Sequence, residues 1–310
     1  MKIGFLYGGQ GSQQEQMGKD LYENYSDVKD FYDSINIDFD IKDYSFNKDL
    51  ATISKTRYTQ PIMVAFQISV TKILKDMGIK PDYTAGLSIG EYSALEASGV
   101  IKEVEAVEIA EKRGLAMESA SKSIDTGMVA VLGMDISVID KVTKEVSDKN
   151  GKVEIANINC PGQVVISGEA KTVAKAVEKL KKAGARRTIP LNVSGPFHTS
   201  YMEPASKELV EIFKDYEFKR EEVPVVYNLL GSVKTTEDIK DIMINQVKSS
   251  VRFQESIEYM ASQGVDTFVE IGFGDVIKGF LKKIDRKLKV YSANNIETIN
   301  ALKEVLNNGK

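Results

Sequence analysis

A serine between two glycines and a single histidine are the residues of this 310-residue chain best suited to covalent chemistry. Ser88 lies in the run Gly86-Leu87-Ser88-Ile89-Gly90, which has the spacing of a nucleophile elbow, a sharp turn that exposes a serine hydroxyl. His198 is the only histidine, and an imidazole beside a serine can accept its proton at neutral pH. The pair predicts acyl transfer through an ester of Ser88. The alternative is a helix-capping serine and a loop histidine without a catalytic role.

Arg113 is the candidate for binding an anion. It lies in a predicted helix from about residue 103 to 120, and its neighbours three and four positions away are all apolar: Ile109, Ala110, Ala116 and Met117. No carboxylate is therefore at helix-pairing distance. A guanidinium in this setting can bind a substrate carboxylate through two parallel hydrogen bonds. The alternative is an arginine that extends to solvent or pairs with a distant acid.

A glycine-rich segment, Gly8-Gly9-Gln10-Gly11-Ser12-Gln13, follows the first predicted strand. It lacks the lysine of a phosphate-binding loop and the full glycine spacing of a dinucleotide-binding loop. Its glycines leave backbone N–H groups free to face a ligand. We expect the N–H groups of Gln10 and Ile89 to form an oxyanion hole, the alternative being a plain turn.

Alternating strand and helix patterns are expected to position these residues. Residues 2–7, 83–87, 223–227 and 267–271 have the composition of strands, and residues 89–97 that of a helix closed near Gly99. Thr59-Gln60-Pro61 has the character of a helix start, with apolar residues at helical spacing as far as residue 77. This alternation predicts an α/β domain with a parallel sheet. Ser88 is then at a strand-to-helix corner.

Residues 127–192 follow a different order, strand, helix, strand, strand, helix and strand, which is the ferredoxin-like arrangement. We therefore predict a large parallel-sheet α/β domain with a hydrolase-like core, formed by residues 1–126 and 193–310. A small ferredoxin-like α+β subdomain, residues 127–192, is inserted into it.

Composition limits the classes of function. The formal net charge of −4 argues against general nucleic-acid binding, and no apolar run is long enough for a membrane span. With one cysteine, Cys160, and one histidine, we expect neither a disulfide framework nor a metal site. The start of the chain lacks the pattern of a signal peptide, so a cytoplasmic location is expected.

Ordered segments along nearly the whole chain resemble the malonyl-CoA:acyl-carrier-protein transacylases of bacterial fatty acid synthesis and the acyltransferase domains of polyketide synthases. The matching segments are Gly9-Gln10-Gly11-Ser12-Gln13, Thr59-Gln60-Pro61, residues 85–95, Arg113-Gly114, Asn159-Cys160-Pro161-Gly162-Gln163, Pro196-Phe197-His198, Tyr227-Asn228 and Glu270-Ile271-Gly272. The chain departs from the usual pattern at Leu87, where histidine is common, at Tyr7-Gly8-Gly9, and at Phe273. Leu87 leaves the preference among acyl groups open.

The resemblance implies that Ser88 and His198 form the catalytic pair and that Arg113 binds the malonyl carboxylate. It places the backbone carbonyl that orients the histidine at Arg252. It also implies a substrate pocket that includes Leu87, Met117, Phe197 and Asn228.

The implied reaction transfers a malonyl group from malonyl-CoA to the phosphopantetheine thiol of acyl carrier protein, with no bound cofactor. The alternatives are a trans-acting acyltransferase or a proofreading acyl hydrolase of a polyketide pathway, and a non-catalytic scaffold that binds carrier protein. Carrier proteins are acidic, so a basic run is the candidate docking surface, although such a run is also typical of a solvated helix face: Lys282, Lys283, Arg286 and Lys287.

Overall fold

The computed structural model describes residues 1–149 and 151–308. Its strands are β1 (Ile3–Tyr7), β2 (Tyr83–Gly86), β3 (Thr126–Leu132), β4 (Val153–Cys160), β5 (Gln163–Glu169), β6 (Arg187–Pro190), β7 (Val225–Val226), β8 (Thr267–Ile271) and β9 (Lys289–Ala293). Its helices are α1 (Lys19–Asn24), α2 (Ser26–Ser34), α3 (Ile41–Asn47), α4 (Leu50–Ile53), α5 (Thr56–Asp76), α6 (Gly90–Ala97), α7 (Glu103–Ser121), α8 (Ile136–Val146), α9 (Ala170–Lys182), α10 (Glu203–Ile212), α11 (Ile239–Gln246), α12 (Phe253–Ser262), α13 (Val276–Ile284) and α14 (Ile296–Asn308), with 3-10 turns at Ser200–Met202 and Phe213–Asp215.

The larger sheet is parallel and has the strand order β7-β2-β1-β8-β9. Side chains alternate across its central strand, as the two-residue period of a strand requires. Phe5 and Tyr7 pack into one core, whereas Leu6 packs into a second core with residues of α12 and α13. Helices therefore cover both faces, and the predicted parallel α/β domain is confirmed.

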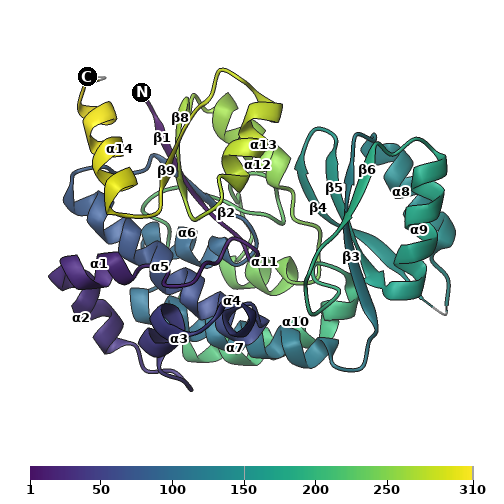
Figure 1. The fold of residues 1–310 in the computed structure, drawn as a ribbon, viewed down its shortest axis with the longest axis horizontal. Helices are drawn as coiled ribbons and strands as arrows, with labels where there is room; N and C mark the ends of the chain where they lie inside the picture. The colour runs from purple at the N-terminus through teal and green to yellow at the C-terminus, as the bar shows by residue number, and fades with distance from the viewer. Residues whose placement is uncertain (150, 309–310) are drawn as a thin grey trace.

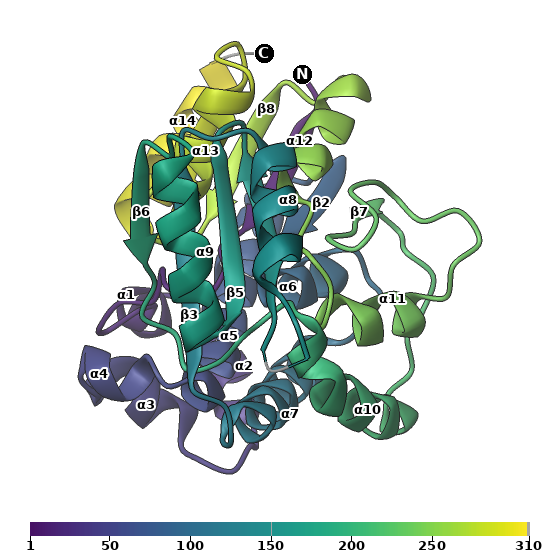
Figure 2. The same cartoon turned by 90° about the vertical axis from the view of Figure 1, so that its right-hand side faces the viewer.

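The smaller sheet is antiparallel, with the order β4-β5-β3-β6. This is the strand order of a ferredoxin-like sheet, and the predicted order of strands and helices is present. Figure 2 shows α8 and α9 side by side against these strands. Their apolar residues and inward-facing strand residues such as Val131 and Ile166 form a separate core. The other face, with Met128, Ala130 and Val165, is directed toward the larger domain and lines a cavity described below.

One predicted helix boundary is wrong. Helix α5 begins at Thr56, so Pro61 lies inside the helix and not at its start. Pro61 lacks the N–H that would bond to the carbonyl of Arg57, which costs one helical hydrogen bond. The first turn has other anchors, because the hydroxyl of Thr59 donates to the carbonyls of Ile53 and Lys55.

Several elements were not predicted from the sequence. They include edge strand β9, helix α14 and the short helices α1 to α4, which Figure 1 shows together with α7 in the lower part of the view. Among the described residues, no helix has the combination of length and apolarity needed to cross a membrane.

Candidate active site

The predicted nucleophile, Ser88, lies just after the carboxyl end of β2 and lines a cavity between the two sheets. Ser88 follows β2 with a φ of 56°, a left-handed conformation that is rare for serine and typical of a nucleophile elbow. Two glycines make this turn possible. A Cβ atom at Gly86 would lie 2.0 Å from the carbonyl carbon of Gly90, and one at Gly90 would lie 2.4 Å from the carbonyl oxygen of Tyr7. The chain therefore packs too tightly around Ser88 for any larger residue at either position.

Ser88 and His198 form the predicted contact. The Oγ atom of Ser88 is 2.7 Å from Nε2 of His198, although 110 positions separate the residues in the chain. His198 also has a left-handed backbone, with a φ of 59°, and its N–H donates to the carbonyl of Val247 at 3.2 Å. The imidazole is thus held from its backbone as well as from its ring.

The predicted orienting carbonyl is wrong. Nδ1 of His198 lies 3.1 Å from the carbonyl oxygen of Gln246, the last residue of α11, and not from that of Arg252. The carbonyl of Arg252 instead accepts from the N–H and hydroxyl of Ser256 in the first turn of α12. The Gln246 carbonyl is available because the last carbonyls of a helix have no partner within it. A contact with this carbonyl requires Nδ1 to carry the proton, which leaves Nε2 as the acceptor toward Ser88.

The environment of His198 keeps its ring neutral. Burial and the nearby charge of Arg113 lower the pKa of His198 to about 4, while backbone carbonyls act in the opposite direction. Both causes disfavour a second positive charge in the site. At neutral pH the imidazole is therefore ready to accept a proton.

Arg113 is fully buried and points at the nucleophile. Its Nη1 donates to Oε1 of Gln60 at 2.8 Å, and its Nη2 lies 2.9 Å from Oε1 of Gln246 and 3.3 Å from Oγ of Ser88. Its guanidinium also lies over the ring of Tyr92, with 5.6 Å between the guanidinium carbon and the ring centroid. None of the described acidic side chains forms an ion pair with it. Neutral oxygens thus hold this cation, and its charge remains available to an anion.

Sequence reasoning missed three residues of this network. Gln60 and Gln246 supply the amide oxygens on Arg113, and Glu91 lies behind them with no exposed surface. Burial raises the pKa of Glu91 to about 7, against the effect of hydrogen bonds from Gln246 and Asn228 and the charge of Arg113. Gln60 and Glu91 lie inside the segments that resemble the acyltransferases, so those segments offered a signal for both. Gln246 lies outside every such segment.

A cavity of about 230 Å³ opens beside Ser88, between the two sheets. Of the predicted pocket residues, Leu87, Met117 and Phe197 line it. Asn228 does not line it, because its side chain lies behind the elbow, where Oδ1 accepts from the N–H of Ser88 at 2.8 Å and Nδ2 donates to the carbonyl of Gly86. The prediction that Asn228 lines the substrate pocket is therefore wrong. Its side chain instead stabilises the turn at Ser88.

The two predicted oxyanion donors also face this cavity. Gln10 and Ile89 line it, and within the described part of the chain no acceptor is bonded to the backbone N–H of either. Free N–H groups beside a nucleophile are what an oxyanion hole requires. Among the described side chains, no group of three His, Cys, Asp or Glu residues is placed to hold a metal ion.

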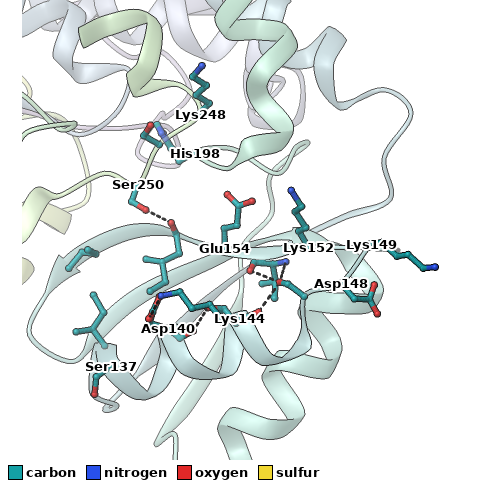
Figure 3. A pocket seen from close by; sticks show the side chains of 17 residues that line it. Ser137, Asp140, Lys144, Asp148, Lys149, Lys152, Glu154, His198, Lys248 and Ser250 are labelled. Carbon is teal, nitrogen blue, oxygen red and sulfur yellow. Dashed lines mark hydrogen bonds and ion pairs between the residues drawn. The ribbon is translucent and has the colours of Figure 1, made fainter.

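A larger cleft of about 950 Å³ also includes His198 among its lining residues, and α8 and β4 line it as well (Figure 3). Several of its charged side chains already have partners, either within the cleft or beside it. Lys144 pairs with Asp140, Lys248 pairs with Glu203, and the carboxylate of Glu154 accepts from Ser200. The acyl-sized cavity at Ser88, and not this cleft, contains the nucleophile.

One of the four proposed docking residues reaches the edge of the cavity. Nζ of Lys283, on α13, donates to Oε1 of Gln163 at 2.9 Å, and Gln163 lines the cavity. Lys282, Arg286 and Lys287 are exposed, as a solvated face would be.

Comparison with known proteins gives concordant matches. Residues 4–300 match the model of the acyl transferase domain family. The chain is 44% identical over 301 residues to a malonyl CoA-acyl carrier protein transacylase of Bacillus subtilis, covering 96% of this chain and 95% of the relative. A crystal structure of MCAT from Streptococcus pneumoniae superposes with a TM-score of 0.93 at 42% identity, covering 98% of this chain and 100% of the other. A malonyl-transacylase solved in complex with its type II PKS acyl-carrier protein also has a TM-score of 0.93, at 32% identity, over 98% of this chain and 100% of that one.

Proposed function

The chain belongs to the acyl transferase domain family, and from this membership we propose that it transfers a malonyl group from malonyl-CoA to the phosphopantetheine thiol of acyl carrier protein, in fatty acid biosynthesis. One observation carries the choice of malonyl: the unpaired guanidinium of Arg113 lies 3.3 Å from the Ser88 hydroxyl in a buried site. A malonyl thioester carries a free carboxylate near its reactive carbonyl, and this guanidinium is placed to bind it.

In the first half-reaction, Oγ of Ser88 attacks the thioester carbonyl carbon while Nε2 of His198 takes the hydroxyl proton. The N–H groups of Gln10 and Ile89 stabilise the oxyanion that forms. The carbon–sulfur bond then breaks, the coenzyme A sulfur takes the proton from His198 and leaves as the thiol, and the malonyl group remains as an ester on Ser88.

The second half-reaction reverses this chemistry with another thiol. His198 takes the proton from the phosphopantetheine thiol of the carrier protein, and the sulfur attacks the ester carbonyl. The bond to Ser88 Oγ breaks, Oγ regains a proton from His198, and malonyl-carrier protein is released. The reaction takes place in the cavity between the large domain, residues 1–126 and 193–310, and the inserted subdomain, residues 127–192. We place this activity in the cytoplasm.

Intact mass spectrometry after mixing with malonyl-CoA tests the proposal. We expect the wild-type chain to gain the mass of one malonyl group and the Ser88→Ala variant to gain none. Ser262→Ala, which removes an exposed serine hydroxyl at the end of α12, outside the lining of the cavity, is the matched control and should keep the adduct. An adduct that persists in Ser88→Ala, or no adduct on the wild type, contradicts the proposal.

A second candidate function is supply of malonyl groups to a polyketide carrier protein, favoured by the similarity to the transacylase solved with a type II PKS carrier. Addition of purified fatty-acid or polyketide carrier proteins to the malonylated chain separates the two. The candidate pathway is the one whose carrier gains the malonyl group faster. Loss of the adduct as free malonate, with no gain on either carrier, would indicate an acyl hydrolase instead.

A further inference from the structure

Glu91 is a buried acid that contacts residues of the active site, yet it has no role in the proposed reaction. It lies in the first turn of α6, three residues after Ser88, and is fully buried. Burial of an ionisable group without partners is costly, and both oxygens of Glu91 have partners. Oε1 accepts from the backbone N–H of Asn228 at 3.0 Å, and Oε2 accepts from Nε2 of Gln246 at 2.8 Å.

Each of these partners belongs to the active site. Asn228 holds the elbow, since its side chain accepts from the N–H of Ser88 and donates to Gly86. Gln246 forms hydrogen bonds with His198, Arg113 and Ser88. Its backbone carbonyl accepts from His198, its Oε1 accepts from Arg113, and its Nε2 donates to the carbonyl of Ser88. Glu91 is therefore one hydrogen bond away from the residues that hold the nucleophile, the base and the cation.

The orientation of the Gln246 amide determines what Arg113 meets. As placed, its oxygen faces the guanidinium and its nitrogen faces two acceptors, Oε2 of Glu91 and the carbonyl of Ser88. Rotation of the amide by 180° would direct its NH₂ group at the Arg113 guanidinium, where donor meets donor. Both oxygens of Glu91 accept an N–H in the structure, which is the role of a carboxylate, so Glu91 favours the observed orientation.

We propose that Glu91 is a positioning residue for acyl-group selection, whose carboxylate holds the Gln246 amide with its oxygen toward Arg113 and so aims the guanidinium at the substrate carboxylate. This role rests on the malonyl transfer proposed above. It also accounts for the absence of a direct acidic partner. The carboxylate acts on Arg113 through a neutral amide, so the cation is positioned without being neutralised by an ion pair.

The test is Glu91→Gln, which keeps the size and shape of the side chain but replaces one acceptor oxygen with a donor NH₂ group. Glutamine at this position would direct its NH₂ at either the N–H of Asn228 or the NH₂ of Gln246, both of which are donors. Loss of a charge-assisted hydrogen bond in a buried site predicts malonyl transfer about 10- to 100-fold slower. Acetyl transfer, which does not use Arg113, should fall only a few-fold.

Glu96→Gln is the matched control. Glu96 lies on the same helix, its pKa is likewise raised to about 7 by burial, and its nearest cation is Lys75 at 3.9 Å, away from Ser88. We expect this variant to keep the wild-type ratio of malonyl to acetyl transfer. A reduced ratio in Glu96→Gln as well would overturn the specific role of Glu91.

Equal losses of malonyl and acetyl transfer in folded Glu91→Gln would also overturn the proposal, because they indicate a general structural role. If Glu91→Gln does not fold, Gln246→Met decides the matter, since it removes the amide through which Glu91 acts. That variant must lower the malonyl-to-acetyl ratio, and an unchanged ratio refutes the proposal. Failure of the proposed function is seen separately, as a wild-type chain that forms no malonyl ester in the same assay.

Discussion

The active site, at the carboxyl end of β2 in the large sheet, and the small antiparallel subdomain place their charged residues in opposite ways. In the subdomain the core is apolar and the charged groups are at the surface, as in the exposed pairs Lys144–Asp140 and Lys179–Glu145. At the active site the charged and polar groups are inside. Arg113 and Glu91 are fully buried there, and Ser88 and His198 both have left-handed backbones.

The difference teaches where each region obtains its stability and its specificity. Burial of apolar surface stabilises the subdomain, and its exposed ion pairs contribute less than about 1 kcal/mol each. The active site carries desolvated charges and strained residues, which cost stability and are retained for chemistry. The contrast predicts that substitutions in one region change activity while those in the other change stability.

The largest expected effect is that of Arg113→Ala on malonyl transfer. Removal of one partner of a buried charge–carboxylate interaction costs about 2–5 kcal/mol, so kcat/KM for malonyl-CoA should fall by at least about 30-fold. The acetyl group has no free carboxylate, so acetyl-CoA should be used nearly as well as before. Parallel measurement of kcat/KM for both thioesters tests this expectation.

Equal losses of kcat/KM with the two thioesters would contradict this expectation, because Arg113 would then stabilise the fold of the site and not bind the malonyl carboxylate. Arg57→Ala is a suitable control, since Arg57 is a half-exposed arginine in α5 that lies near Glu118 at 3.6 Å. It should change neither value by more than about twofold, as expected for a surface pair.

The subdomain should show the converse behaviour. Ile166 in β5 is fully buried in the core formed with α8 and α9, so Ile166→Ala should lower the free energy of unfolding by about 2–5 kcal/mol. Urea denaturation followed by circular dichroism measures this loss. The folded fraction should still form the malonyl ester on Ser88, because the cavity is lined by the opposite face of the sheet. An unchanged denaturation midpoint together with loss of acylation would contradict this prediction, because the subdomain core would then determine activity and not stability.

The sequence predicted the subdomain well because its information is local. Residues 153–157 and 163–167 contain the valine and isoleucine residues typical of strands, and the observed strands begin at the expected residues. The parallel sheet and the strand-to-helix corner at Ser88 were likewise predictable from short segments. Edge strand β9 was not, since its residues Lys289–Ala293 are mostly only partly buried and give no strong pattern.

The sequence predicted the reacting residues of the site but not the contacts that hold them in place. A single histidine identified the partner of Ser88, but the contacts that hold the pair join residues far apart, such as Gln246 and Ser88, which are separated by 158 positions. No local pattern distinguishes Gln246 from any other glutamine at a helix end. The orienting carbonyl was placed at Arg252 from the family resemblance, whereas the structure shows the contact at Gln246.

The smallest expected effect concerns pH and separates two causes at the active site. Protonated His198 cannot accept the Ser88 proton, so acyl transfer should fall as the pH decreases through the pKa of His198, about 4. Burial is the larger cause of this low pKa and the charge of Arg113 the smaller. Removal of that charge in Arg113→Ala should therefore raise the pKa of His198 and move the acidic limb of the profile to higher pH. Acetyl-CoA is the thioester to use, because its binding does not need Arg113, and circular dichroism at each pH confirms that the chain is folded. An acidic limb that stays in place, or moves to lower pH, would mean that Arg113 does not act electrostatically on His198, and burial alone would then account for the neutral base.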